Sequence, residues 1–94
     1  TKKIVIWGGG RIFDAMITFG GLNPKDVYMV IDKYLSLYVQ EIRGYSLKNP
    51  SILNEEDSIN SILVYIASRD YADEIKREAE SYGVSNFIDF VTYK

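Results

Sequence analysis

Three consecutive glycines, Gly8-Gly9-Gly10, lie between an apolar run at residues 3–7 and a stretch whose apolar residues have helical spacing. At the start of a helix, backbone N–H groups and the positive end of the helix dipole favour an anion such as phosphate. Glycine suits such a turn because it has no side chain to block the ligand and tolerates positive φ. We therefore predict a phosphate-binding turn at Gly8, Gly9 and Gly10.

The glycines match only part of the dinucleotide-binding pattern Gly-x-Gly-x-x-Gly. Gly8 and Gly10 occupy the first two glycine positions, but Phe13 stands at the third. A small residue there lets the helix pack closely on the strand, so the phenyl ring is expected to displace the helix or to require small neighbours. The alternative interpretation is that the glycines only form a tight strand-to-helix turn.

Polar residues that could complete a nucleotide site follow the predicted strands. Asp32 ends the second apolar run, where an acidic residue can accept hydrogen bonds from ribose hydroxyls, and Lys33 beside it leaves NAD and NADP as alternatives. The Arg11 guanidinium could pair with a phosphate, while Ser68 and Arg69 follow a third strong strand at the edge where ligands collect. The structural alternatives are a solvated strand end for Asp32, an ordinary surface position for Arg11, and a helix cap for Ser68.

The chain contains no His and no Cys. It therefore cannot build a Cys/His zinc site, a thiolate nucleophile or a Ser-His-Asp triad. The Tyr-x-x-x-Lys pair of short-chain dehydrogenases is absent, as is the phosphate-loop pattern Gly-x-x-x-x-Gly-Lys-Ser/Thr. We predict no catalytic residue and no metal site.

Composition indicates one globular domain, since the 94 residues are 47% hydrophobic and 26% charged. The net charge of −2 comes without a basic stripe, so nucleic acid is not expected as a partner. The longest apolar run, residues 62–67, is too short to cross a bilayer, so we expect no membrane partner and a soluble, cytoplasmic location. Because the chain begins at Thr1 without Met, we expect residues 1–94 to be a domain excised from a larger protein.

Alternating strand and helix patterns predict an α/β fold. Apolar runs without alternation, typical of strands covered on both faces, occupy residues 3–7, 27–31 and 61–67. A weak edge strand is expected at residues 44–47 and a last strand at Phe87 to Val91. Together these predict three layers, with a parallel sheet of about five strands in the order 3-2-1-4-5 and helices on both faces.

The first helix is expected to follow Gly10 and to end at Gly20-Gly21, and the second to run from Ser68 or Asp70 to Gly83. Residues 33–44 show no clear period and are interpreted as an irregular segment with some helical character. Its apolar residues either cover the sheet edge or, if exposed, mark a partner surface.

Four segments resemble a known module, namely residues 4–10 (Ile-Val-Ile-Trp-Gly-Gly-Gly), 30–32, 44–47 and 62–67. They look like the Rossmann-like N-terminal domain of acetyltransferases that modify nucleotide-linked amino sugars, over nearly the whole chain. Similar domains are attached to FkbM-type methyltransferases, glycosyltransferases and sugar-nucleotide dehydratases. The resemblance implies phosphate at Gly8 to Gly10 and the nucleoside at Asp32. The acetyltransferases' β-helix and catalytic His have no counterpart, so acetyl transfer is not implied.

We therefore predict a non-catalytic domain that binds a nucleotide or nucleotide sugar, with NAD(P) as a further candidate ligand. The parent protein would be a sugar-modifying or methyltransferase-type enzyme of polysaccharide biosynthesis, in which a neighbouring domain is the partner. The predicted ligand contacts are Gly8, Gly9, Gly10, Arg11, Asp32, Lys33 and Ser68. Two alternatives remain: a scaffold or dimerisation module that has lost its ligand, and an NAD(P)-dependent oxidoreductase subunit.

Overall fold

A six-stranded sheet forms the centre of the computed structural model, which describes residues 3–19 and 22–89. The strands are β1 (Lys3–Trp7), β2 (Val27–Ile31), β3 (Glu41–Ile42), β4 (Tyr45–Lys48), β5 (Ile62–Ile66) and β6 (Phe87–Asp89). The α-helices are α1 (Arg11–Thr18) and α2 (Ala72–Ser81), and short 3₁₀ turns are η1 (Pro24–Asp26), η2 (Leu35–Leu37), η3 (Pro50–Glu55) and η4 (Ile59–Ser61). The predicted helix end at Gly20-Gly21 and the predicted last strand residue Val91 lie outside the described residues.

The strand order is β3-β4-β2-β1-β5-β6, which differs from the predicted 3-2-1-4-5. Neighbouring strands are parallel except for β3 and β4, which pair antiparallel. The prediction of a wholly parallel sheet of about five strands was wrong because it did not include β3. This strand pairs with β4, which was expected to be the edge strand, and forms the edge of the sheet itself. The three long apolar runs form the strands at the centre, β2, β1 and β5, as their lack of alternation predicts.

The additional strand arises from a two-residue hairpin within the segment that showed no clear period. Ile42 pairs with Tyr45, and the two residues between them, Arg43 and Gly44, have φ of 49° and 83°. Positive φ at both central positions is typical of the type I′ turn, whose twist matches that of paired strands. The Nε atom of Arg43 also lies 2.6 Å from Oδ1 of Asp14, so an ion pair ties the hairpin to α1.

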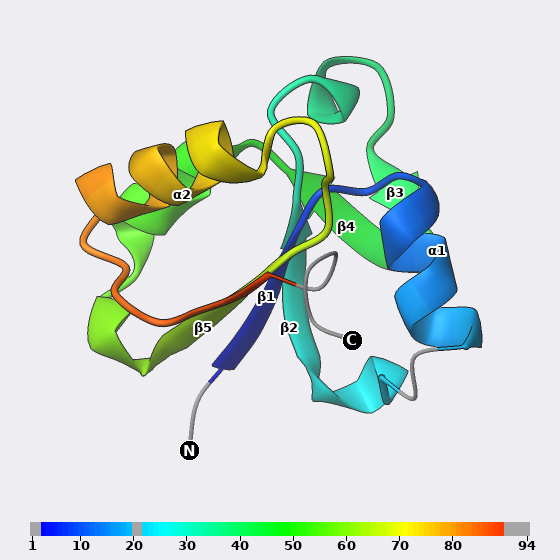
Figure 1. Cartoon of the computed structure of the whole chain (residues 1–94), viewed down its shortest axis with the longest axis horizontal. Coiled ribbons are helices and arrows are strands. Elements are labelled where there is room, and N and C mark those ends of the chain that lie inside the picture. The colour runs from blue at the N-terminus through cyan, green and yellow to red at the C-terminus, as the bar shows by residue number, and fades with distance from the viewer. Residues whose placement is uncertain (1–2, 20–21, 90–94) are drawn as a thin grey trace.

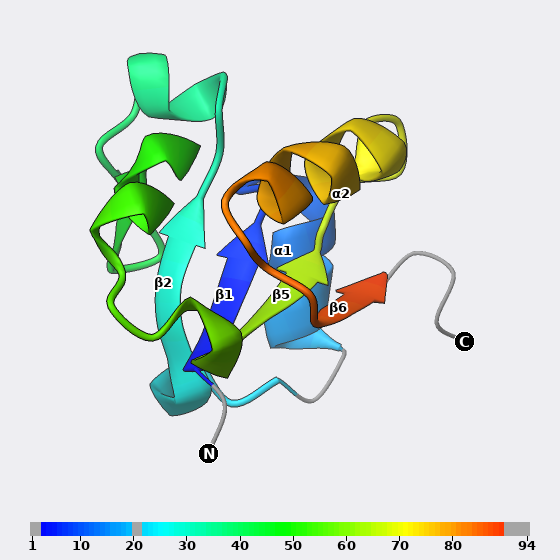
Figure 2. The same cartoon turned by 90° about the vertical axis from the view of Figure 1, so that its left-hand side faces the viewer.

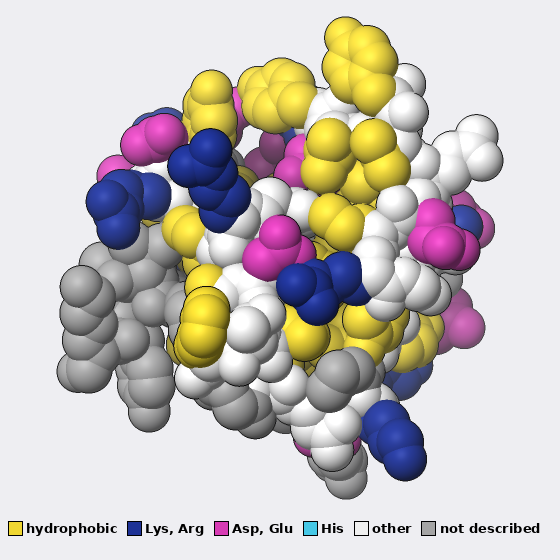
Figure 3. All heavy atoms as spheres, turned by 90° about the vertical axis from the view of Figure 1, so that its right-hand side faces the viewer, with side chains coloured by type: hydrophobic (Ala, Val, Ile, Leu, Met, Phe, Trp, Pro, Cys, Tyr) yellow, Lys and Arg dark blue, Asp and Glu magenta, His cyan; other side chains and the backbone are white. Residues whose placement is uncertain are grey.

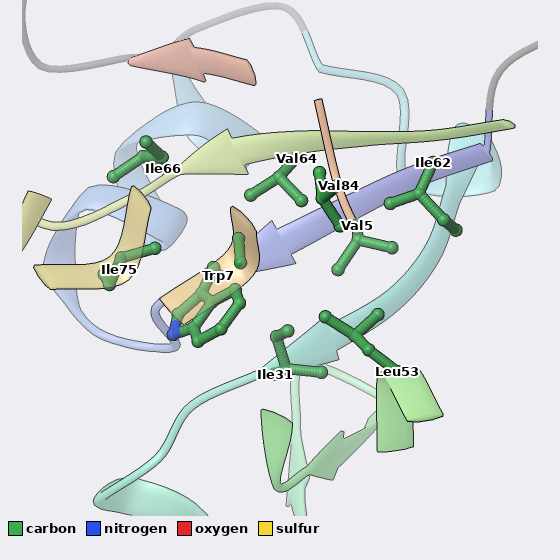
Figure 4. Close-up of a cluster of buried hydrophobic side chains, with 10 residues drawn as sticks. Val5, Trp7, Ile31, Leu53, Ile62, Val64, Ile66, Ile75 and Val84 are labelled. Carbon is green, nitrogen blue, oxygen red and sulfur yellow. The ribbon is translucent and has the colours of Figure 1, made fainter. Parts of the chain in front are cut away.

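The two α-helices cover opposite faces of the sheet, as Figures 1 and 2 show. The α1 helix buries Phe13 and Met16, and α2 buries Ile75 and Ala79. These pairs belong to two separate clusters of buried apolar side chains, one on each face. Figure 4 shows the α2-side cluster, in which the Trp7 indole lies near Ile75. No helix in the described part of the chain is long and apolar enough to span a membrane.

Phe13, the residue at the third glycine position, points into the core. Its side chain is fully buried, and its ring meets that of Tyr45 edge to face, with centroids 6.1 Å apart. The layer between α1 and the β4 side of the sheet thus accommodates the phenyl ring. Phe13 therefore does not occupy the space in front of the glycine turn.

Candidate functional site

The turns that follow β1, β2 and β5 meet at one edge of the sheet, because parallel strands end on the same side (Figure 1). A groove of about 760 Å³ lies at this edge. Its lining comes from all three turns: Gly8, Gly10, Arg11 and Ile12; Asp32, Tyr34, Leu35 and Tyr38; and Ala67 to Tyr71. In open α/β sheets, ligands bind outside the carboxyl ends of the strands. We therefore take this groove as the candidate site.

The need for glycine differs among the three positions of the turn. Gly8 has a φ of 118°, and a Cβ there would lie 2.6 Å from the carbonyl oxygen of Ala67, so no other residue fits. A Cβ on Gly9 would lie 3.2 Å from the Leu35 side chain, which is a tight contact. At Gly10, φ is −93° and a Cβ would meet nothing within 4 Å. The protein's own packing therefore does not require glycine at position 10, which opens onto the groove.

The carboxylate of Asp32 holds two of the turns together. Its Oδ2 accepts a hydrogen bond from the N–H of Gly9 at 2.9 Å. Its Oδ1 accepts from the N–H groups of Tyr34 at 3.0 Å and Leu35 at 2.8 Å. Since an ionised carboxylate has about four acceptor positions, one remains for a ligand donor. The Asp32 carboxylate thus has a structural role in addition to any contact with ribose.

The N-terminus of α1 has no side-chain cap. The first backbone bond of the helix runs from the N–H of Asp14 to the carbonyl of Gly10 at 3.2 Å, so the preceding N–H groups of the first turn have no partner of this kind. In contrast, the N–H of Gly8 donates to the carbonyl of Ile31 at 2.8 Å, and that of Gly9 donates to Asp32. The N–H groups that can meet an anion are therefore those of the helix rather than those of Gly8 and Gly9.

Two arginines line the groove from opposite turns, Arg11 at the start of α1 and Arg69 after β5. Within residues 3–19 and 22–89, neither guanidinium forms an ion pair, whereas Lys3, Lys33 and Arg43 do. An anion in the groove would give both guanidinium groups a partner with matching geometry.

Lys33 and Ser68 have structural contacts of their own. The Nζ atom of Lys33 lies 3.5 Å from Oε1 of Glu78 on α2, and this carboxylate raises the pKa of Lys33 above its ordinary value. Lys33 does not line the groove. Ser68 does, and its Oγ accepts the N–H of Tyr71 at 3.2 Å, a local contact of the kind expected of a cap. The helix α2 itself begins at Ala72, later than the predicted start at Ser68 or Asp70.

The groove thus brings together Gly8, Gly10, Arg11, Asp32 and Ser68 from the predicted set, and leaves Gly9 and Lys33 outside its lining. Three tyrosines that we had not proposed as ligand contacts also line it, namely Tyr34, Tyr38 and Tyr71. Their signal in the sequence was weak, because they sit in turns whose conformation could not be derived from periodicity. Figure 3 shows hydrophobic side chains gathered along the upper rim of this face, where these turns lie.

The described residues contain no group of three or more acidic side chains placed to hold a metal ion. Comparison with known proteins finds no matching family model, no matching curated protein and no matching solved structure. The resemblance to nucleotide-sugar acetyltransferase domains therefore stays a prediction.

Proposed function

We propose that this chain is a Rossmann-like module that binds a nucleotide or nucleotide sugar at the carboxyl edge of its sheet and has no catalytic groups of its own. The observation that carries the proposal is the groove in which Gly10 opens onto the uncapped first turn of α1. Arg11 and Arg69 line the same groove, and neither forms an ion pair within the described residues. Helix N–H groups and guanidinium forks are both complementary to phosphate oxygens.

The order of the strands determines which turn would contact each part of the ligand. The turn after β1 lies between those after β2 and β5, so phosphate at Gly10 and Arg11 would have the β2 turn on one side and Arg69 on the other. On the β2 side, the remaining acceptor position of Asp32 suits a sugar hydroxyl. The Tyr38 ring, whose residue is 84% exposed, offers a face for a base.

The proposed role is binding because the described residues that line the groove include no nucleophile hydrogen-bonded to a base. Asp32, the carboxylate nearest the glycine turn, is engaged by three backbone N–H groups. His and Cys are absent from the whole sequence. The reaction would then belong to another part of a larger sugar-modifying or methyltransferase-type enzyme, as the sequence resemblance implies.

The test is a titration of the ¹⁵N-labelled chain with UDP, UDP-N-acetylglucosamine, ADP, NAD⁺, NADP⁺ and coenzyme A, followed by amide shifts. We expect at least one nucleotide to shift the amides of Gly10, Arg11 and Arg69. Arg11→Ala and Arg69→Ala should each weaken that ligand by roughly tenfold or more, as for a hydrogen bond to a charged group. Arg77→Ala, an exposed position on α2, is the matched control. No shift from any of these compounds at millimolar concentration would overturn the proposal.

A second candidate, a scaffold or dimerisation module, is favoured by one observation. Around η2, Leu37 is 67% exposed and lies outside the groove lining, next to the exposed Tyr38. Sedimentation equilibrium of the wild-type chain and of Leu37→Ser tests this candidate. A dimer that Leu37→Ser dissociates, together with silence in the nucleotide titration, would favour the scaffold.

A further inference from the structure

Three side-chain contacts join the turn after β2 to α2 and to Tyr71, the residue that precedes α2, and they cross above the end of β1. The Nζ atom of Lys33 lies 3.5 Å from Oε1 of Glu78, and the Tyr34 hydroxyl lies 3.5 Å from Oε1 of Glu74. The ring of Tyr34 also packs against that of Tyr71, with centroids 5.9 Å apart and planes at 47°. We call these five residues the clasp.

The clasp closes one side of the sheet edge. On the α2 side, beneath the clasp, lies a cavity of about 50 Å³, with Trp7, Gly8 and Ile75 among its lining residues. Trp7 and Ile75 belong to the buried cluster of Figure 4, so this cavity cannot deepen without opening the core. A cavity of this size suits a few water molecules and not a nucleoside. The groove of about 760 Å³ includes Gly10, Arg11 and Ile12, from the start of α1 on the opposite face.

A dinucleotide would need the space that the clasp closes. After β1 the chain turns to α1 on one face of the sheet, and after β5 it turns to α2 on the other (Figures 1 and 2). The crevice between such diverging turns is where a dinucleotide crosses the strand ends in open α/β sheets. Lys33 reaches Glu78, and Tyr34 reaches Glu74, across the α2 side of this crevice.

Building on the proposed function, we propose that the clasp is a specificity element that limits the ligand to one nucleotide unit, such as a nucleoside diphosphate or its sugar conjugate, and excludes dinucleotides. Each contact is exposed and weak by itself, but the ring contact and the two polar contacts act on the same turn. The clasp residues Glu74 and Glu78 do not line the groove, so they can be changed without altering the groove's own side chains.

The experiment compares each nucleoside diphosphate with its two-nucleotide counterpart by isothermal titration calorimetry: ADP with NAD⁺, and UDP with diuridine 5′,5′-diphosphate. We expect the wild-type chain to bind the one-nucleotide compound roughly tenfold or more tightly than its counterpart. In Glu74→Ala/Glu78→Ala that preference should fall to about threefold or less, with the affinity for the smaller ligand nearly unchanged. Tyr71→Ser removes the ring contact and should lower the preference as well, but Tyr71 also lines the groove, so only the ratio of the two affinities is compared for this variant.

The control is Asp73→Ala/Glu80→Ala, which removes the same number of negative charges from exposed positions of the same helix. This variant should keep the wild-type preference, and circular dichroism should show that all variants fold. The clasp proposal alone is overturned if the wild-type chain binds both sizes of ligand equally, or if the clasp variants keep the wild-type preference. If no nucleotide binds at all, the proposed function fails and the clasp proposal fails with it.

Discussion

The backbone N–H of Gly9 donates a 2.9 Å hydrogen bond to Oδ2 of Asp32, which comes 23 residues later in the chain. Through Oδ1, the same carboxylate accepts two N–H groups of the turn that follows β2. One side chain therefore sets the distance between the glycine turn and the β2 turn, which form two walls of the groove. Any ligand that contacts Asp32 meets a carboxylate that these backbone bonds already hold in place.

Asp32→Asn should destabilise the fold by about 1–3 kcal/mol, because the amide would replace one accepting oxygen by a donor next to a backbone N–H. Urea denaturation measures this as a lower midpoint at an unchanged slope. Asp57→Asn, which changes an exposed carboxylate in the same way, should stay within about 0.5 kcal/mol of the wild type. Equal midpoints for the two variants would show that the Asp32 bonds contribute little to stability.

Gly8→Ala should destabilise the chain by about 1–3 kcal/mol or more, since it combines a φ of 118° with a Cβ placed 2.6 Å from the Ala67 carbonyl oxygen. Gly10→Ala should cost no more than about 1 kcal/mol, because its Cβ meets nothing within 4 Å. Thermal denaturation of both variants checks the difference. Similar losses at the two positions would mean that Gly10 also has a packing role.

The central part of the fold could be predicted from the sequence because burial on both faces leaves an unbroken apolar run. Residues 3–7 and 27–31 form strands with the predicted bounds, and β5 occupies Ile62–Ile66 within the predicted 61–67. The edge could not be predicted in the same way, since β3 has two residues and depends on a hairpin closed by Arg43 and Gly44. Arginine is not among the residues expected at positive φ, so the turn left no recognisable signal.

Parts of the candidate site could be predicted only where the residue type at one position, together with its place in the sequence, indicates a role. The glycine turn and the acidic residue at the end of β2 could be recognised from their places in the sequence. The hydrogen bonds of Asp32 and the contact between Tyr34 and Tyr71 depend on the conformations of the turns after β2 and β5. These turns have no sequence period from which their conformations could be predicted. Likewise, the sequence showed that Phe13 departs from the glycine pattern, but only packing shows that its ring contacts Tyr45.

Gly10→Ser should stabilise the chain slightly and weaken the ligand. Serine is a good N-cap residue, because its hydroxyl can accept a hydrogen bond from a first-turn N–H of α1. Replacing a glycine cap by serine should raise the free energy of unfolding by roughly a few tenths of a kcal/mol. The same hydroxyl would occupy the N–H groups proposed to bind phosphate. We expect a raised midpoint of thermal unfolding together with a loss of roughly tenfold or more in nucleotide affinity by calorimetry. Unchanged affinity in this variant would place the phosphate elsewhere.

Phe13→Ala should cost about 3–5 kcal/mol, because it leaves a cavity in the layer between α1 and the sheet. Phe13→Leu should cost about 1.5 kcal/mol or less and keep the chain folded for a double-mutant cycle with Tyr45→Leu. The cycle should show a coupling of about 0.5–1.5 kcal/mol from the edge-to-face contact. Phe19→Ala is the control, since Phe19 is exposed, and it should change stability by about 0.5 kcal/mol or less.

Tyr45 should make the fold sensitive to alkaline pH. Burial raises the pKa of its hydroxyl above the ordinary value of 10.0. Because the folded-state pKa is the higher one, the folded chain binds more protons above pH 10, so this contribution to stability is complete below that pH and is lost as pH rises through the folded-state pKa.

The free energy of unfolding should therefore fall less steeply above pH 10 in Tyr45→Phe than in the wild-type chain. Urea denaturation at a series of pH values measures both curves. Lys33, whose pKa Glu78 also raises, adds a loss of the same sign to both proteins, so only their difference reports on Tyr45. Parallel curves would show that the Tyr45 hydroxyl ionises equally readily in the folded and unfolded chains.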